Sequence, residues 1–279
     1  MAIFLSCHSA FVYRVYKNLF QFHTQIAHHK SIIVGCLINH FRDGLSAAVT
    51  GFALNANEFG LIAGVGCLKR GSILKGMRRH HTIIVDVKDY TEMEILGATR
   101  DDAAGECFDK AARVLGLPYP GGKPMDELAR QSQGGVYDLP RAHVDGADLD
   151  MSFSGLKTAV VNLAHNAQQK GEPLDRAALA RDFTRAVSDE LVPRAMEAAR
   201  RCGRKTIVAA GGVAANSIIR ADLKAACEKE GCTLYVPPLS LCGDNGAMIG
   251  AQGYYEYLAG KRGGLDLNAY ATMDLDERE

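Results

Sequence analysis

Hydrophobic and polar positions follow a clear period only from residue 82 onward. Two apolar runs precede that point, at residues 32–37 and 59–65, and each is short enough to be a strand or part of a buried helix. Residues 82–87 and 90–96 then have the character of strands, with a short polar turn between them. The pattern therefore predicts two strands joined by a turn.

A helix is predicted directly after these strands. Its apolar positions recur with helical spacing at Ala103, Cys107, Phe108, Ala111, Val114 and Leu115. Thr99 or Asp101 can cap the start of this helix, and Gly116 can end it. A second helix is expected near residues 125–131.

The middle of the chain alternates between loop and helix. Residues 134–150 are polar and rich in turn formers, which predicts an exposed loop. Ser154 is the expected cap of a helix that reaches about residue 169. Residues 174–202 have the apolar face of a long amphipathic helix, and Pro193 is expected to kink it or split it in two.

The last third predicts a βαβ unit. Its parts are a strand (205–210), a glycine turn (211–216), a helix (217–230) and a second strand (233–237). In such a unit the helix N-terminus faces whatever lies over the glycines, although glycine also permits close helix packing, so both interpretations stay open. A final helix should end near Gly260, with Asp244 or Asn245 at its N-cap.

Three carboxylates line the first predicted helix. Asp102, Glu106 and Asp109 fall at i, i+4 and i+7, beside the apolar face. Stacked like charges destabilise a helix unless something pairs with them. The following turn at residues 119–122, Tyr-Pro-Gly-Gly, lets a ligand approach the backbone closely. The stripe is either a solvated acidic face or part of a site for a ligand with hydroxyl groups.

Composition narrows the class of protein. The 32 basic residues balance the 32 acidic ones, so a nucleic-acid substrate would have to be met by a local patch or a partner. Eight cysteines without a C-x-x-C pair favour reduced thiols and a cytoplasmic location. No H-x-x-x-H spacing occurs among the nine histidines, which favours scattered surface histidines over a metal site. The sequence pattern predicts neither a signal peptide nor a membrane span.

Five motifs together identify a family. They are DDAAGECFDK (101–110), YPGG (119–122), SFSGLKT (152–158), GGVAAN (211–216) and LCGDNGAM (241–248). In this order they resemble the tRNA N6-adenosine threonylcarbamoyltransferases, formerly called glycoproteases or O-sialoglycoprotein endopeptidases. The resemblance covers residues 82–260 and implies the α/β, actin-like (sugar-kinase-like) fold of two lobes around a ligand cleft.

The resemblance also implies a reaction and its site. The threonylcarbamoyl group would pass from threonylcarbamoyl-adenylate to N6 of the adenosine beside the anticodon of tRNAs that read ANN codons. Asp109, Gly122, Asp126 and Asn216 match residues that hold the adenylate, the carboxylates by accepting hydrogen bonds from ribose hydroxyls. Asp244 matches one ligand of an iron or zinc ion, one per subunit, which would act as a Lewis acid. No catalytic side chain is assigned. The implied partners are a paralogous non-catalytic subunit and an ATPase subunit, without a membrane.

Residues 1–81 depart from the family pattern. At most a partial match to the family's opening phosphate turn occurs, at residues 4–9, and it lacks both acidic residues of that turn. Gly44 stands where the family has a second metal-binding histidine. We therefore expect a divergent remnant of the N-terminal lobe at 1–100 and the C-terminal actin-like lobe, with the ligand motifs, at 101–279. A shift of reading frame or a fused segment upstream of residue 82 is our hypothesis for the abrupt change.

Two other functions stay open at this point. At residues 78–82 the chain reads Arg-Arg-His-His-Thr and lacks the glycines with which the family contacts phosphate. This loss and the missing histidine favour an inactive paralogue that pairs within the same tRNA-modifying complex. A small-molecule kinase of the same fold would need an acidic base and phosphate turns in both lobes, and one such turn is recognisable. An endopeptidase has no support, since no zincin motif or nucleophile elbow occurs.

Overall fold

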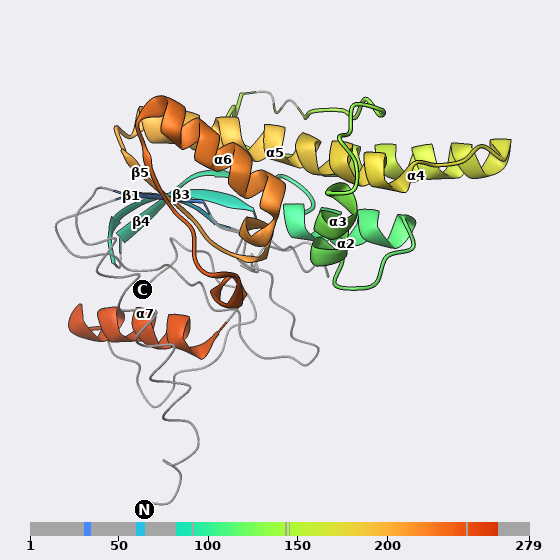
Figure 1. The fold of residues 1–279 in the computed structure, drawn as a ribbon. Helices are drawn as coiled ribbons and strands as arrows, with labels where there is room; N and C mark the ends of the chain where they lie inside the picture. Colours follow the sequence, from blue (N-terminus) through green and yellow to red (C-terminus); the bar gives the residue numbers. More distant parts are fainter. Residues whose placement is uncertain are drawn as a thin grey trace, which may run out of the picture.

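The computed structural model is a mixed α/β fold built on one six-stranded sheet (Figure 1). It describes residues 31–34, 60–64, 82–90, 92–142, 144, 146–243 and 245–261. The strands are β1 (Ser31–Val34), β2 (Gly60–Gly64), β3 (Ile83–Asp89), β4 (Glu92–Ala98), β5 (Thr206–Ala209) and β6 (Thr233–Tyr235). Their order across the sheet is β4-β3-β1-β2-β5-β6.

Strand pairing follows the predicted connections. β3 and β4 confirm the prediction of two strands joined by a short turn, and they pair antiparallel. β5 and β6 are parallel, as required of two strands joined through a helix. The strands β1 and β2 overlap the two early apolar runs, and each of these strands runs parallel to β5.

The helices are α2 (Ala104–Val114), α3 (Gly122–Ala129), α4 (Ser154–Lys170), α5 (Arg176–Arg201), α6 (Ser217–Glu230) and α7 (Gly246–Leu258). Two short 3-10 helices, η1 (Gly212–Ala215) and η2 (Leu239–Leu241), lie in the last third. Figure 1 shows α5 and α6 along one side of the sheet and α7 on the other. Within the described residues, no helix combines the length and the apolar character that crossing a membrane requires.

The sheet separates two hydrophobic clusters because its side chains alternate between faces. On β3, Ile84 belongs to the large cluster under the helices, whereas Ile83, Val85 and Val87 belong to a smaller cluster on the opposite face. The large cluster includes buried residues of α2, α3, α4, α5 and α6. This layer fixes the helix that carries the acidic stripe against the rest of the lobe.

The predicted βαβ unit is confirmed as β5, η1, α6 and β6. Asn216 caps α6 by accepting hydrogen bonds from the backbone N–H groups of Ile218 and Ile219, at 3.0 and 3.1 Å. Gly231 ends the helix with a φ of 64°, a left-handed conformation that suits glycine. Asn245, one of two predicted caps of α7, accepts from the N–H of Met248 at 3.1 Å.

Three predicted caps are wrong. Neither Thr99 nor Asp101 caps α2, whose first N–H, that of Ala104, donates to the hydroxyl of Thr82 at 2.9 Å. Ser154 is the first residue of α4 rather than its cap, and its hydroxyl donates to Asp101. In both places a residue distant in sequence satisfies the end of the helix, which local capping rules do not consider.

Pro193 does not split the long helix, contrary to the predicted alternative. α5 continues as a single helix of 26 residues with Pro193 inside it. The proline is exposed, whereas Leu191, Val192, Ala195 and Met196 around it are buried. Packing of these neighbours outweighs the loss of one backbone hydrogen bond on the solvent side.

Candidate ligand-binding site

The predicted binding residues meet where α2, α3 and α6 come together. The carboxylate of Asp109 on α2 accepts a hydrogen bond from the N–H of Gly121 at 2.7 Å, immediately before α3. Asp126 on α3 accepts from the N–H and the hydroxyl of Ser217, at 3.0 and 2.7 Å. These bonds connect the Gly121–Gly122 turn on one side with the Asn216–Ser217 corner on the other.

The two glycines of the turn have different surroundings. A Cβ on Gly121 would lie 2.4 Å from the Cβ of Ala112 and 3.0 Å from the carbonyl oxygen of Phe108. Gly121 is therefore needed for the close approach of α3 to α2. A Cβ on Gly122 would have no neighbour within 4 Å among the described residues. Packing against that part of the chain does not require glycine there, which fits a position where a ligand approaches the backbone.

Asn216 holds an unused hydrogen-bond donor. The residue is 6% exposed, its Oδ1 caps α6, and its buried Nδ2 has no hydrogen-bond partner among the residues that the structure describes. An amide donor left unsatisfied in the interior costs about 1–3 kcal/mol. Such a group is expected to bind an acceptor that the chain itself does not supply. The amide lies directly after η1, and Gly211 before η1 has a φ of 90° and a ψ of 174°, a region that glycine occupies almost alone.

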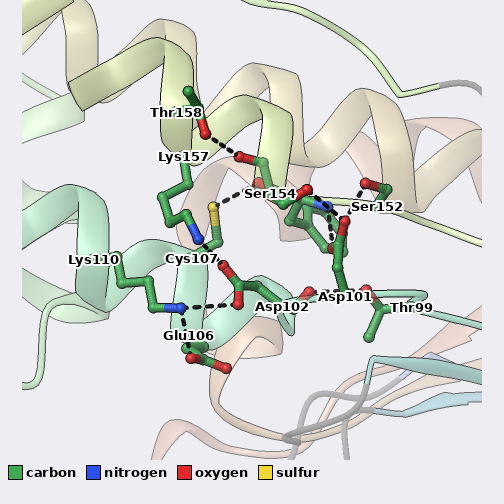
Figure 2. A network of polar contacts seen from close by, with 11 residues as sticks. Thr99, Asp101, Asp102, Glu106, Cys107, Lys110, Ser152, Ser154, Lys157 and Thr158 are labelled. Carbon is green, nitrogen blue, oxygen red and sulfur yellow. Dashed lines mark hydrogen bonds and ion pairs between the residues drawn. The ribbon is translucent and has the colours of Figure 1, made fainter. Parts of the chain in front are cut away.

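The acidic stripe divides into two parts with different roles. Lys110 and Lys157 pair with Asp102 at 2.8 and 2.7 Å, and Lys110 also pairs with Glu106 at 2.7 Å (Figure 2). Burial raises the pKa of Asp102, but hydrogen bonds from Lys110 and Lys157 outweigh it and hold the pKa below its ordinary value. Asp102 and Glu106 are thus paired within the fold rather than forming a free acidic face, and of the three carboxylates only Asp109 contacts the glycine turn.

The SFSGLKT motif has a structural role that the sequence did not reveal. Figure 2 shows the carboxylate of Asp101 accepting hydrogen bonds from the hydroxyls of Ser152 and Ser154, and the N–H of Phe153 donates to it at 2.8 Å. Asp101 therefore attaches the start of α4 to the segment before α2, while Lys157 attaches the first turns of the same helix. Burial raises the pKa of Asp101, but these hydrogen bonds outweigh it and lower the pKa overall.

The predicted metal ligand, Asp244, lies outside the described residues. His40 and Gly44, at the place of the histidine motif of the family, lie outside them as well. The described part of the chain contains no group of three or more His, Cys, Asp or Glu side chains that could hold a metal ion. The described residues therefore do not by themselves fit a metal centre.

Comparisons with known proteins agree with the motifs. Residues 79–251 match the family model described as tRNA N6-adenosine threonylcarbamoyltransferase. A protein of that name from Clostridium botulinum (strain 657 / Type Ba4) is 46% identical over 198 residues, which are 71% of this chain and 58% of the relative. Those from Moorella thermoacetica and Bacillus cereus are each 48% identical over 70% of this chain and 57% of their own length. The chain thus spans less than two thirds of these relatives.

A solved structure of full-length HypF in its phosphate- and nucleotide-bound form is also similar. Its TM-score is 0.49 at 13% identity, over 70% of this chain and 39% of that one.

Proposed function

Because the chain belongs to the tRNA N6-adenosine threonylcarbamoyltransferase family, we propose that it transfers the threonylcarbamoyl group from threonylcarbamoyl-adenylate to tRNA. Its mixed α/β architecture fits the actin-like fold expected of the family. The acceptor would be N6 of the adenosine beside the anticodon of tRNAs that read ANN codons. The bond from N6 to the carbamoyl carbon forms, the bond from that carbon to the phosphate oxygen breaks, and AMP leaves as N6 loses a proton to solvent.

We assign the adenylate to the junction of α2, α3 and α6. Asp109 and Asp126 would accept hydrogen bonds from ribose hydroxyls, and Gly122 would leave room for the ribose. The N-terminus of α6, with its positive end of the helix dipole, would lie near the phosphate. These groups bind and orient the adenylate, and no side chain is assigned to the chemical step itself.

The observation that carries the proposal is the buried Nδ2 of Asn216, which has no hydrogen-bond partner within the described part of the chain. Asn216→Asp tests it sharply, because aspartate caps a helix as well as asparagine but cannot donate from that position. With AMP as the probe in titration calorimetry, we expect the affinity to fall about tenfold, the cost of one lost hydrogen bond and an added negative charge. The melting temperature should stay near that of the wild type.

Asn162→Asp is the matched control, since Asn162 is exposed on α4 and the change in charge is the same. This control should bind AMP as the wild type does. An Asn216→Asp protein that binds AMP with wild-type affinity would contradict the assignment of the site. Gly122→Ala should also weaken AMP binding without loss of stability, since its added methyl group would occupy the space left for the ligand.

The activity itself is tested by transfer in vitro. Purified protein would be combined with iron(II), a supply of threonylcarbamoyl-adenylate, the partner subunits and tRNA lacking the modification, and the nucleosides would be measured by mass spectrometry. Loss of the modified nucleoside in Asp109→Ala would support a catalytic subunit. A protein that binds AMP and the partners but gives no product would indicate a pairing subunit instead.

The remaining assignments rest on the sequence motifs. We propose that Asp244 is one ligand of an Fe2+ or Zn2+ ion, one per subunit, and that the chain acts in the cytoplasm with a paralogous subunit and an ATPase subunit. Metal analysis of the purified protein tests the first point. One equivalent of iron or zinc that is lost in Asp244→Ala would support it, and equal metal content in both proteins would overturn it.

A further inference from the structure

We propose that Arg220 is a positioning residue, which holds the turn carrying Asn216 at a fixed spacing from the segment around Cys242. This inference rests on the proposed function, because Asn216 belongs to the proposed adenylate site. Cys242 lies two positions before Asp244 in the sequence. Arg220 would therefore connect the part of the proposed site that binds the adenylate with the motif at residues 241–248, which contains Cys242.

The side chain of Arg220 contacts three separate parts of the chain. It lies one turn into α6, and its Nε donates to the carbonyl oxygen of Ala214 in η1. Its Nη2 donates to the carbonyl oxygen of Pro237, just after β6, at 3.0 Å. The same nitrogen donates to the sulfur of Cys242 at 3.1 Å. One planar group thus spans η1, the end of β6 and the segment after η2.

Arginine suits this arrangement better than lysine. The guanidinium holds Nε and Nη2 in one rigid plane, so its three N–H groups are aimed at the three acceptors together. A lysine amine is a single point on a flexible chain and cannot reach acceptors on both sides of the plane at once. The charge alone would not fix the spacing.

Cys242 is the far end of this connection. Its side chain is 2% exposed, and its sulfur also lies 3.6 Å from the carbonyl oxygen of Pro238. A buried thiol is shielded from alkylating reagents, so the rate of its reaction reports whether this segment stays in place.

The test compares Arg220→Met and Arg220→Lys with the wild-type protein. Lys224→Met is the matched control, because Lys224 is one turn further along α6 and its side chain is 70% exposed. Alkylation of each cysteine by iodoacetamide would be followed by peptide mass spectrometry, AMP affinity by calorimetry, and transfer by the nucleoside assay. Cys227 on the same helix is an internal control, since it is buried away from Arg220 contacts.

In both Arg220 variants we expect alkylation of Cys242 to accelerate about tenfold while Cys227 stays protected, because only the local contact is lost. AMP affinity should change by less than about threefold, since Asn216 and Asp126 are unchanged. The kcat should fall about tenfold or more with little change in KM for the adenylate, because misplacement of about 1 Å between reacting parts can cost about 100-fold. Lys224→Met should match the wild type throughout.

The proposal would be overturned if Cys242 were alkylated as slowly in the Arg220 variants as in the wild-type protein. Equal acceleration at Cys227 would also overturn it, because it would mean that Arg220 holds the whole helix rather than this spacing. An increase in KM with unchanged kcat would place the effect of Arg220 on the adenylate alone and contradict the spacing role. If the wild-type protein gives no product, the proposed function fails, and the comparison of Cys242 with Cys227 still decides the role of Arg220.

Discussion

At the scale of single residues, adjacent glycines can have opposite reasons to be glycine. Gly121 has no room for a side chain because α2 lies against it, whereas none of the described residues would lie within 4 Å of a Cβ on Gly122. The sequence Tyr-Pro-Gly-Gly does not distinguish the two. Only the packing partner, Ala112, separates the glycine of the fold from the glycine of the proposed site.

Gly121→Ala should destabilise the protein by about 1–3 kcal/mol, the usual cost of overpacking, because the new methyl group meets helix backbone and the Cβ of Ala112. Gly122→Ala should leave the free energy of unfolding unchanged or slightly higher, since alanine favours the first turn of α3. Urea denaturation of both variants checks this. Equal stability of the two would show that the close contact at Gly121 relaxes without cost.

Asp101 should make stability depend on pH. Its pKa is lowered in the folded protein, so its contribution is present above the unfolded value of about 3.9 and is lost as pH falls through the folded pKa. Asp101→Asn should cost about 1–2 kcal/mol at pH 7, allowing for solvent screening, through its lost contacts with Ser152, Phe153 and Ser154.

The difference between Asp101→Asn and the wild type should shrink as the pH falls below about 4, because the carboxyl of the unfolded chain then binds a proton that the folded chain takes up only at lower pH. Urea midpoints between pH 3 and pH 7 measure it. Glu172→Gln, which removes a charge at an exposed position after α4, is the control and should show no such trend. A difference that stayed constant with pH would exclude Asp101 as the titrating group.

At the scale of elements, α5 shows tertiary packing overriding a local signal. Its buried residues occur both before and after Pro193, so a break there would separate apolar contacts on both sides. Proline lacks the N–H that would bond to the carbonyl of Asp189 one turn earlier. The helix continues through Pro193 and lacks this one backbone hydrogen bond on its exposed side.

Pro193→Ala should therefore stabilise the protein. Restoring one helical hydrogen bond on the exposed side should gain about 1–2 kcal/mol, after the greater freedom of the unfolded chain is subtracted. Thermal unfolding followed by circular dichroism measures the change. Val161→Ala on the exposed face of α4 is the comparison and should shift stability by less than about 0.7 kcal/mol. A lower melting temperature for Pro193→Ala would show that the proline is needed in place.

At the scale of the whole molecule, the sheet joins segments from both of the expected domains. β3 and β4 lie before residue 100, yet they share one sheet with β5 and β6. The division into 1–100 and 101–279 remains a prediction. α7 lies on the side of the sheet away from α5 (Figure 1). Its Tyr255 stacks on Tyr90 in the β3–β4 turn, with ring centroids 3.7 Å apart.

The other face of α7 carries exposed apolar side chains. Tyr254, Tyr257 and Leu258 are 57–60% exposed and share one face at i, i+3 and i+4. We expect the isolated chain to be poorly soluble, since contiguous exposed apolar groups favour association. Changing Tyr257 and Leu258 to Gln should reduce light scattering on warming.

Val136→Gln with Val161→Gln provides the control for this prediction, because both valines are exposed but lie apart on other elements. This pair should not alter light scattering. A soluble, monomeric wild-type sample with a sharp two-state melt would contradict the prediction of poor solubility.

The sequence by itself determined the elements whose signals are local. α6 begins after Asn216 and ends before Gly231 as predicted, because its cap and its stop lie within one turn of its ends. The two strands after residue 82 and the βαβ unit followed in the same way from short apolar runs and the turns between them. The family was identified from five motifs, each of them a short local pattern.

Tertiary structure decided which groups meet across long stretches of chain. The partners of Asp101 lie 51–53 residues away, and Ser217, which donates to Asp126, lies 91 residues from it. The end of a helix or a carboxylate takes whichever partner the fold brings near, and sequence spacing carries no information about that choice. For this reason the caps of α2 and α4, the pairing of the acidic stripe and the contacts of Arg220 emerged only from the folded chain.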